Sequence, residues 1–414
     1  MTLDVYFGSA KAGELHSTDN RGIVFSYSRD YLADKDVQSL SASLPLREKE
    51  FSQKECLPFF SGLLPEGDSR KKLADYLHIS ETSTLRLLEA LGGECAGLVT
   101  ITADTQPVLP QTEYALSPEN YERLDDDRLA DFISRMNIRP LIKADGKLRL
   151  SLAGAQEKIA LARFDGEWHL PMNGAPSTHI LKPAREGMLS TLAINEYTCM
   201  RLAKLLSLPA PTVDLAHIAG RDVLVEERYD RIRNGGSVRR LHQEDFCQAL
   251  GIMNTAKYQN DGGPGIADIL GAIRKHCSVP AVETQKFLRS VVFNYLIGNC
   301  DSHGKNYALL YKGRATELAP LYDAVSTAIY PDLTDKLSMK IGRHYEIGKV
   351  THDDFSLLAD TLGIKDMALR RIFGEFKSSA GKAFETLKSD EKISGEVLVV
   401  IQDELCGRLD RLGI

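Results

Sequence analysis

The sequence predicts an α+β protein with two or three domains. Its 414 residues exceed what one ordinary hydrophobic core holds. Strand-like runs occupy two separate stretches, and the second stretch leads into a long region of helical periodicity. Strands followed by helices, without regular alternation of the two, indicate an α+β fold. A hydrophobic content of 43% with 26% charged residues is typical of a soluble globular protein.

Charge and cysteine usage exclude several classes of protein. A formal net charge of −6 gives no general attraction to nucleic acid or to anionic membranes. No apolar run approaches the ~18–20 residues of a membrane span, and the N-terminus lacks the apolar region of a signal peptide. The 7 cysteines form no C-x-x-C pair, which favours reduced thiols over a disulfide framework or a zinc site. We therefore expect a cytoplasmic protein of bacterial type that does not bind membranes.

Residues 1–105 are predicted to form a small mixed α/β unit. Alternating hydrophobicity indicates strands, and a polar turn joins the first two. The expected elements, in order, are strands at 3–8 and 22–28, a helix that begins at Thr82 or Ser83 and ends at Gly92, and a strand at 95–103.

Residues 106–147 are predicted to be a linker. Pro107, Pro110 and Pro140 punctuate it, and the acidic run at 119–132 is typical of one surface helix. The domain boundary is placed there.

The second domain is divided into residues 148–240 and 241–414. Asp165-Gly166 between two apolar runs is the strongest hairpin signal in the chain. The other elements expected before residue 241 are a strand at 178–183, a helix at 188–208 and a strand at 222–230. The rest of the chain reads as mostly helical, with strand-like runs at 307–313 and 315–323.

A polar interval, Asp301 to Asn306, separates two apolar runs within residues 294–311. Asp-x-x-x-x-Asn is the spacing of a kinase catalytic loop, in which the Asp handles the proton of the nucleophile and the Asn binds magnesium. An Asx-rich turn between a helix and a strand explains these two residues equally well. Asp323, 17 residues after Asn306, follows an apolar stretch, where a buried carboxylate needs a partner or a metal. It favours the kinase interpretation as a second magnesium ligand.

Lys182 and Glu196 form a second candidate pair. Lys182 follows two apolar residues of a strand, so its ammonium could reach phosphate oxygens in a cleft or extend to water. Glu196 shares a helix face with Leu192, Cys199 and Leu202, where an ionised carboxylate wants a partner. An ion pair between the two would match the strand-lysine to helix-glutamate pair of kinases. A solvated Glu196 at the edge of the stripe is the alternative.

Two weaker signals concern nucleotide binding. The small residues Ala153-Gly154-Ala155 open a strand and would let backbone N–H groups approach an anion, although they form no Walker A loop. The strand end at 226–229 could form a hinge to an adenine ring or simply be a charged edge strand.

With these residues in hand, the chain resembles the HipA family of bacterial serine/threonine protein kinases, the toxins of HipA–HipB toxin–antitoxin pairs. The resemblance covers most of residues 50–325 and rests on stretches that occur in family order: FFSGLLPEGDSRKKLA, LLEALGGECAGLV, SLAGAQEKIAL, HILKP, NEYTCMRLAKLLSLPAP, LVEERYDR, LHQEDFCQALG, LIGNCDSHGKNYALL and LAPLYDAVS.

The resemblance implies a bilobal protein-kinase-like fold, related also to lipid kinases, behind a small mixed α/β N-terminal subdomain and with a mainly helical C-terminal lobe. It implies that 148–240 is the ATP-binding N-lobe part and that Asp301, in 241–414, is the catalytic base. It assigns Mg²⁺ to Asn306 and Asp323 and makes Glu196 a structural ion-pair partner. The ATP contacts that it implies are Leu152, Ala153, Gly154, Ala155, Gln156, Glu157, Lys158, Lys182, Glu227, Arg228, Tyr229, His303, Gly304, Lys305, Asn306, Tyr322 and Asp323.

The resemblance also implies regulation and partners. Ser151 matches the family's autophosphorylated serine, and the added negative charge would be repelled from an ATP site. The implied target is an aminoacyl-tRNA synthetase, with the glutamyl enzyme as the leading candidate, whose phosphorylation would arrest translation and promote dormancy and persistence. The implied partner is a HipB-like helix-turn-helix antitoxin, through which the kinase would corepress operator DNA.

Three other classes remain as alternatives. A small-molecule or lipid kinase would use the same Asp-Asn-Asp core. A metal hydrolase built on Asp301 and His303 would need further ligands, and the 10 histidines form no H-x-x-x-H or H-E-x-x-H pattern. An inactive kinase fold would not need the complete set of Lys182, Asp301, Asn306 and Asp323.

Overall fold

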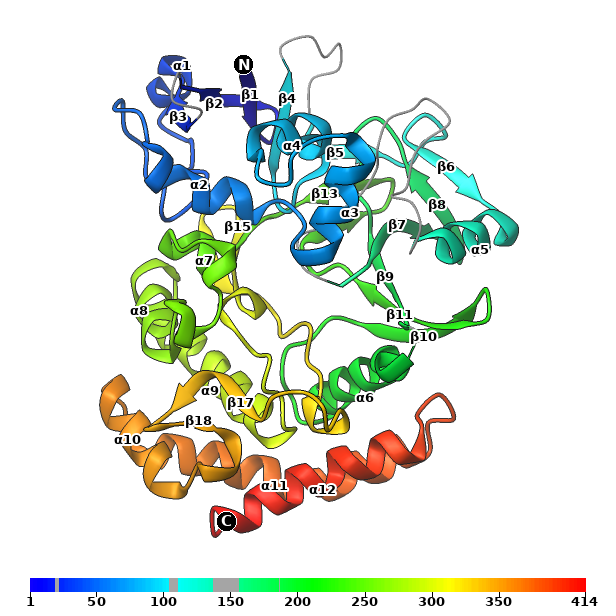
Figure 1. Ribbon diagram of the computed structural model, residues 1–414, viewed down its shortest axis with the longest axis vertical. Helices are drawn as coiled ribbons and strands as arrows, with labels where there is room; N and C mark the ends of the chain where they lie inside the picture. Colours follow the sequence, from blue (N-terminus) through cyan, green and yellow to red (C-terminus); the bar gives the residue numbers. More distant parts are fainter. Residues whose placement is uncertain (19–21, 104–110, 137–155, 186) are drawn as a thin grey trace.

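The computed structural model describes residues 1–18, 22–103, 111–136, 156–185 and 187–414, and a four-stranded sheet and a helical layer lie at its opposite ends (Figure 1). The strands are β1 (Thr2–Phe7), β2 (Ala10–Ser17), β3 (Ile23–Tyr27), β4 (Val99–Ala103), β5 (Glu113–Ala115), β6 (Tyr121–Leu124), β7 (Ile159–Phe164), β8 (Glu167–Pro171), β9 (His179–Pro183), β10 (Val213–Ile218), β11 (Arg221–Glu227), β12 (Arg231–Asn234), β13 (Ser237–Arg240), β14 (His242–Asp245), β15 (Ala308–Lys312), β16 (Ala315–Leu318), β17 (Lys336–Ile341) and β18 (His344–Glu346). The α-helices are α1 (Arg29–Ala33), α2 (Gln53–Gly62), α3 (Gly67–Leu77), α4 (Thr84–Leu91), α5 (Asp126–Arg135), α6 (Leu192–Leu205), α7 (Phe246–Leu250), α8 (Ile266–His276), α9 (Pro280–Leu296), α10 (His352–Leu362), α11 (Asp366–Lys388) and α12 (Gly395–Arg411).

The N-terminal subdomain is an antiparallel sheet of order β3-β2-β1-β4 with helices α2 and α4 packed against it. The sequence predicted β1, β3, β4 and α4, but the stretch between the first two strands is itself strand β2 rather than a polar turn. Its composition, AKAGELHS, has few β-branched or aromatic residues, and its pairing on both sides decides its conformation. The subdomain has its own hydrophobic core, which includes Leu3, Val5, Phe25, Phe59 and Phe60.

The segment predicted as a linker is partly built into the sheets. Helix α5 lies within it, as expected, and buries Leu129 and Ile133. Strand β6 also extends the larger sheet by pairing with β8, and β5 pairs with β13. Only two residues of the four in β6 are buried, so its periodic signal is too short to detect in the sequence.

The central sheet has six strands in the order β10-β11-β9-β7-β8-β6. Asp165 and Gly166 connect β7 and β8 with φ angles of 51° and 84°, as the primed turn of a two-residue hairpin requires. Strand β9 pairs with β11 so that Lys182 lies opposite Leu224, and α6 packs against β10 and β11. This arrangement brings the strand bearing Lys182 next to the helix bearing Glu196.

The C-terminal part is mainly helical. Helices α6, α9, α11 and α12 pack together in one large core that also includes α8 and α10. Gly298 follows α9 with φ +71°, and the chain then enters the polar interval before strand β15. Two short sheets, β14-β15-β16 and β17-β18, complete this part. The sequence predicted strands β15 and β16 but not β14, β17 or β18.

The N-terminal subdomain docks on α7 and β14 through polar contacts. Gln248 Nε2 donates to the carbonyl of Phe59 at 3.1 Å, and Glu244 accepts from Ala42 N at 2.9 Å. A Cβ on Gly62 would lie 2.8 Å from the Gln248 side chain, so α2 and α7 touch closely. The start of α3 is thereby brought to the polar interval of the C-terminal part.

All 7 cysteines are free thiols. In the part of the chain that the structure describes, no helix combines the length and the apolar composition needed to cross a bilayer.

Candidate active site

A cavity of about 870 Å³ lies where the three parts of the molecule meet. Its walls come from the N-terminal subdomain, the six-stranded sheet, α6, the polar interval after α9 and the β17–β18 hairpin. The predicted site residues that line it are Gln156, Lys158, Lys182, Glu196, Arg228, Tyr229, Asp301, His303, Lys305, Asn306, Tyr322 and Asp323. Residues far apart in the sequence therefore converge on one space.

Several predicted ATP contacts are not in the cavity wall. Glu157 forms an ion pair with Lys72 of α3, at 2.7 Å, and Glu227 ends strand β11 outside the wall. Gly304 lies behind the wall, against Pro264. Ser151, Leu152, Ala153, Gly154 and Ala155 lie outside the described residues, so their predicted roles stay predictions.

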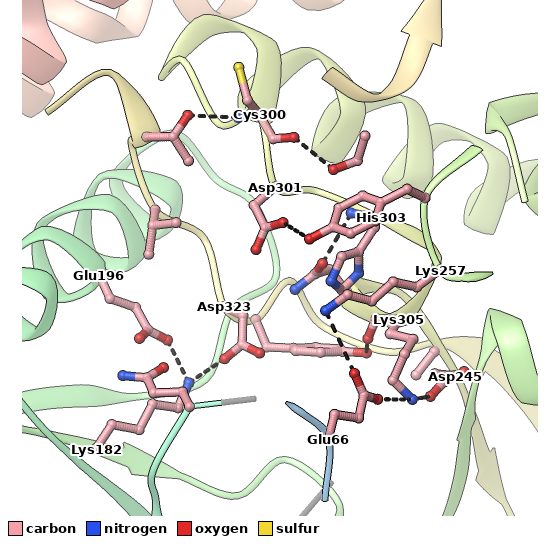
Figure 2. A pocket seen from close by; sticks show the side chains of 18 of the residues that line it. Glu66, Lys182, Glu196, Asp245, Lys257, Cys300, Asp301, His303, Lys305 and Asp323 are labelled. Atoms are coloured by element: carbon pink, nitrogen blue, oxygen red, sulfur yellow. Dashed lines mark hydrogen bonds and ion pairs between the residues drawn. The ribbon is translucent and has the colours of Figure 1, made fainter. Parts of the chain in front are cut away.

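Lys182 is at the centre of a buried charge cluster (Figure 2). Its Nζ lies 2.6 Å from Glu196 Oε1 and 3.0 Å from Glu226 Oε2, and it also contacts Asp323 directly. Burial opposes protonation of Lys182, but the attraction of Asp323, Glu196 and Glu226 raises its pKa well above the usual value. The expected ion pair with Glu196 is present, and Glu196, at 1% exposure, is not solvated at the edge of the stripe.

Asp323 is held in an unusual backbone conformation. Its φ of 52° is left-handed, which costs energy for residues other than glycine and is tolerated best by Asn and Asp. Although burial opposes ionisation, Lys182 and Lys158 lower the pKa of the carboxyl well below its usual range. The site thus maintains a charged carboxylate at a strained position facing the cavity.

The donors at this end of the cavity suit a hard divalent cation. Glu196, Glu226 and Asp323 offer carboxylate oxygens that all lie within 4.8 Å of one another. Asn306 adds an amide oxygen to the same cavity, and oxygen donors of this kind fit Mg²⁺. Burial raises the pKa of Glu196, and Lys182 only partly offsets this, so Asp323 is the better anion of the two.

Asp301, the first residue of the polar interval, lines the cavity. It is exposed to the cavity, but the surrounding walls displace enough water to raise its pKa above that of an ordinary aspartate. Its backbone N donates to Asn299 Oδ1 at 3.0 Å, which fixes the start of the loop. A carboxylate so placed can accept a proton from a hydroxyl group that enters the cavity.

Asn306 has a structural role in the same loop. Its Oδ1 accepts from His303 N at 3.1 Å, and its own N donates to the carbonyl of His303 at 2.9 Å. The Asx-turn interpretation is therefore correct for this residue in the structure as it stands. It does not compete with metal binding, because the oxygen has a second lone pair.

His303 is buried and neutral. Burial, followed by the charges of Lys257 and Lys305, lowers its pKa well below the usual value. It takes no part in the carboxylate cluster found among the described residues, so the hydrolase alternative gains no support from the geometry.

Lys305 joins the N-terminal subdomain to the loop. Its Nζ lies 2.5 Å from Asp245 Oδ2 and 3.2 Å from Glu66 Oε1, and Glu66 also faces Lys257 at 3.6 Å (Figure 2). Two lysines and two carboxylates thus form a continuous chain across the cavity wall. Glu66, at the start of α3, is the contribution of the N-terminal subdomain to this wall.

An aromatic pair also lines the cavity. The rings of Tyr229 and Tyr322 stack with centroids 5.7 Å apart, and Tyr322 donates to the carbonyl of Lys305 at 2.8 Å. The side chain of Arg228 pairs instead with Asp230: its Nε and Nη2 donate to the two carboxylate oxygens of Asp230, at 2.9 and 2.7 Å. Its guanidinium therefore stabilises the chain just after strand β11. Stacked rings offer the flat apolar surface that a nucleobase requires.

Sequence reasoning missed Glu66, Lys257, Tyr258 and Asp245, and it saw Glu226 only as a possible hinge residue. Glu66, Lys257 and Tyr258 lie in segments without regular periodicity. The polar run before Gly262-Gly263-Pro264 was the available signal, because a loop fixed by such residues often carries function.

Comparisons with known proteins identify the family. A family model described as the HipA-like C-terminal domain matches residues 150–384, and one described as the HipA N-terminal domain matches residues 3–102. The chain belongs to the HipA family. It is 31% identical over 380 residues to the serine/threonine-protein kinase toxin HipA of Shewanella oneidensis, covering 88% of this chain and 84% of that protein.

Two further matches span almost the whole chain. Y4mE of Sinorhizobium fredii, named as a candidate kinase, is 38% identical over 418 residues and covers 100% of this chain and 99% of its own length. The solved complex of Shewanella oneidensis HipA with HipB and operator DNA contains a chain that matches with a TM-score of 0.82 and 26% identity, covering 99% of this chain and 97% of that one.

These matches confirm the predicted HipA membership and the predicted kinase-like α+β architecture. They place the chain among the HipA-type serine/threonine kinase toxins of toxin–antitoxin systems.

Proposed function

We propose that this HipA-type chain is an ATP- and magnesium-dependent protein kinase that phosphorylates serine or threonine hydroxyls of a protein substrate. The observation that carries the proposal is the convergence of Lys182, Asp301, Asn306 and Asp323 on one cavity. Phosphoryl transfer needs a base for the hydroxyl, cations for the phosphate oxygens and oxygen ligands for a metal. All three kinds of group are present.

Each group has a distinct task. Asp301 receives the proton of the acceptor hydroxyl, while Lys182 and Lys305 offer positive charge to phosphate oxygens. Asn306 and Asp323 would hold Mg²⁺, which neutralises phosphate charge when bound. The stacked pair of Tyr229 and Tyr322 supports the nucleobase.

We infer that the ion pairs of Lys182 change when nucleotide binds. Lys182 is bound to three carboxylates, so its ammonium is already compensated. If Asp323 holds Mg²⁺, Lys182 keeps Glu196 and Glu226 as partners, and part of its charge is available to phosphate oxygens.

A protein substrate and a protein partner complete the proposed function. We propose an aminoacyl-tRNA synthetase as substrate, with the glutamyl enzyme first, so that phosphorylation arrests translation and promotes dormancy and persistence. A HipB-like helix-turn-helix antitoxin is the proposed partner, through which the chain would join operator DNA. The proposed antitoxin partner and operator DNA are supported by the HipA structure that was solved with HipB and operator DNA.

Substrate class is tested by incubating the purified chain with labelled ATP and Mg²⁺ and offering purified aminoacyl-tRNA synthetases beside a panel of metabolites and lipids. We expect label on a serine or threonine of one synthetase, and none without Mg²⁺. Label only on a metabolite or lipid would establish the alternative, a small-molecule kinase on the same fold.

Ser151 is proposed as the site of self-inhibition. We expect incubation with ATP to add one phosphate to the tryptic peptide that contains it, followed by loss of transfer activity, as mass spectrometry and a parallel assay would show. A Ser151→Ala variant should stay active over the same period. An unmodified peptide in an enzyme that remains active would contradict the proposal.

A further inference from the structure

A tyrosine outside the predicted site residues contacts the proposed catalytic base. The hydroxyl of Tyr258 donates a hydrogen bond to Asp301 Oδ1 at 2.8 Å, and Figure 2 shows this bond at the labelled Asp301. Tyr258 lies between two short 3-10 helices, Asn254–Ala256 and Gln259–Asp261. None of the roles assigned above includes it.

The turn that carries Tyr258 is closed tightly on itself. Gly263 N donates to the carbonyl of Tyr258 at 2.8 Å. A Cβ on Gly263 would lie 2.3 Å from the carbonyl oxygen of Ala256, so only glycine fits there. The backbone of Tyr258 therefore has little freedom.

Neighbouring elements hold the turn from three sides. Pro264 packs against the catalytic loop so closely that a Cβ on Gly304 would lie 2.3 Å from its ring. Gln259 Oε1 accepts from Lys340 N of β17 at 2.9 Å, and Ser61 of α2 donates to Asn254 at 3.2 Å. The turn is thus a rigid support for the tyrosine rather than a loose loop.

The tyrosine ring and hydroxyl are suited to a fixed donor. The ring packs edge-on against His303, with centroids 5.3 Å apart and planes at 76°. Burial, then the charge of Asp301, raises the pKa of the Tyr258 hydroxyl, so it keeps its proton. A neutral tyrosine held in this way can donate to Asp301 throughout a catalytic cycle.

The contact engages one of the two carboxylate oxygens of Asp301 and leaves Oδ2 without this bond. With Oδ1 engaged, rotation of the carboxyl group is restricted, and Oδ2 is presented to an incoming hydroxyl. A base has to lie within hydrogen-bond reach of the proton that it abstracts, so its orientation affects the rate directly.

We propose that Tyr258 is a positioning residue that orients Asp301 for proton abstraction from the acceptor hydroxyl. The inference rests on the proposed kinase function. In the transfer, the acceptor O–H proton goes to Asp301 Oδ2, a bond forms between the acceptor oxygen and the γ-phosphorus, and the bond from that phosphorus to the departing ADP oxygen breaks. Tyr258 keeps its own proton.

The test compares Tyr258→Phe with Tyr197→Phe in the full-length chain. Tyr197 controls for the loss of a tyrosine hydroxyl, because it donates to Asp390 at the same 2.8 Å and lies outside the cavity wall. It is also fully buried and accepts from Arg201 at 2.9 Å, so the loss of its hydroxyl should cost the fold more. We expect Tyr258→Phe to lower kcat by about 10-fold, since positioned acid–base catalysis contributes roughly 10²–10⁴-fold in all. Its KM for ATP should stay within about 2-fold of the wild type, and its Tm should be no lower than that of Tyr197→Phe.

The possible results are distinguishable. An unchanged kcat in Tyr258→Phe, with an active wild type, overturns the inference alone. A fall in kcat matched by an equal loss of ATP affinity, or by a lower Tm than Tyr197→Phe shows, assigns Tyr258 a structural role and also overturns it. A wild type that transfers no phosphoryl group to any acceptor overturns the proposed function and the inference with it.

Discussion

Lys182 and Asp323 form an ion pair although 141 positions separate them along the chain. Lys182 comes from the central sheet, and Asp323 follows the short sheet of the C-terminal part. The contact therefore joins the two lobes inside the cavity. The carboxylate of Asp323, which would hold Mg²⁺, also contacts the ammonium group of Lys182.

Replacing Asp323 by asparagine should abolish the magnesium-dependent part of ATP binding. Asparagine is the sharper substitution, because it tolerates the left-handed backbone at φ 52° that alanine would strain. Lys182 keeps Glu196 and Glu226 as partners, so the fold should persist. Calorimetric titration with ATP, with Mg²⁺ and with a chelator, measures the difference. Equal Mg²⁺ enhancement in the variant and the wild type would exclude Asp323 as a ligand.

Replacing Lys182 by methionine should destabilise the fold. It leaves three carboxylates within 4.8 Å of one another without their central ammonium group. Removal of one partner from a buried charge cluster typically costs about 3–5 kcal/mol of unfolding free energy. Urea denaturation measures the loss, and adding Glu196→Gln to the same chain should recover part of it. A single variant as stable as the wild type would show that the cluster is not a unit.

Glu244 should make stability depend on pH. Burial raises its pKa to about 7, although hydrogen bonds from Ser41, Tyr311 and Ala42 oppose this and the charge of Asp245 adds to it. In the unfolded chain the pKa of the carboxyl returns to its ordinary value of 4.5. Between these values the folded state binds the proton more strongly, so the free energy of unfolding falls as pH rises toward 7.

A Glu244→Gln variant isolates this contribution. Its unfolding free energy minus that of the wild type should grow by up to about 3 kcal/mol between pH 4.5 and 7, because each pKa unit corresponds to 1.36 kcal/mol. Denaturation curves over this range provide the measurement, and Glu385→Gln, at an exposed position, is the control. A difference that stays constant with pH would show that folding leaves the pKa of Glu244 unchanged.

The sequence predicted the elements with clear periodicity. The Asp165-Gly166 hairpin, helix α6 and the strand bearing Lys182 occur where expected, because their apolar patterns match their burial. The apolar face predicted for α6 also included Glu196, which is buried in the structure. Strands β2 and β6 were missed because their composition gives little strand signal, whereas β10, VDLAHI, carries an alternating pattern that could have been detected.

The site was predicted less completely than the fold. Asp301, Asn306 and Asp323 stand out because polar residues interrupt apolar runs. Glu66 and Tyr258 do not, since their importance comes from how the N-terminal subdomain and the turn at 254–265 meet the catalytic loop. Contacts between distant segments leave no local pattern in one sequence. The structure supplies them.

One measurement tests directly whether Asp301 is the catalytic base. The rate of phosphoryl transfer and the affinity for ATP with Mg²⁺ are measured for wild type, Asp301→Asn and the exposed control Asp332→Asn. We predict that Asp301→Asn lowers kcat by about 10²-fold or more, as expected for loss of a general base, while ATP affinity is retained and the control matches the wild type. Transfer by Asp301→Asn at the wild-type rate would contradict the assignment of Asp301 as the base.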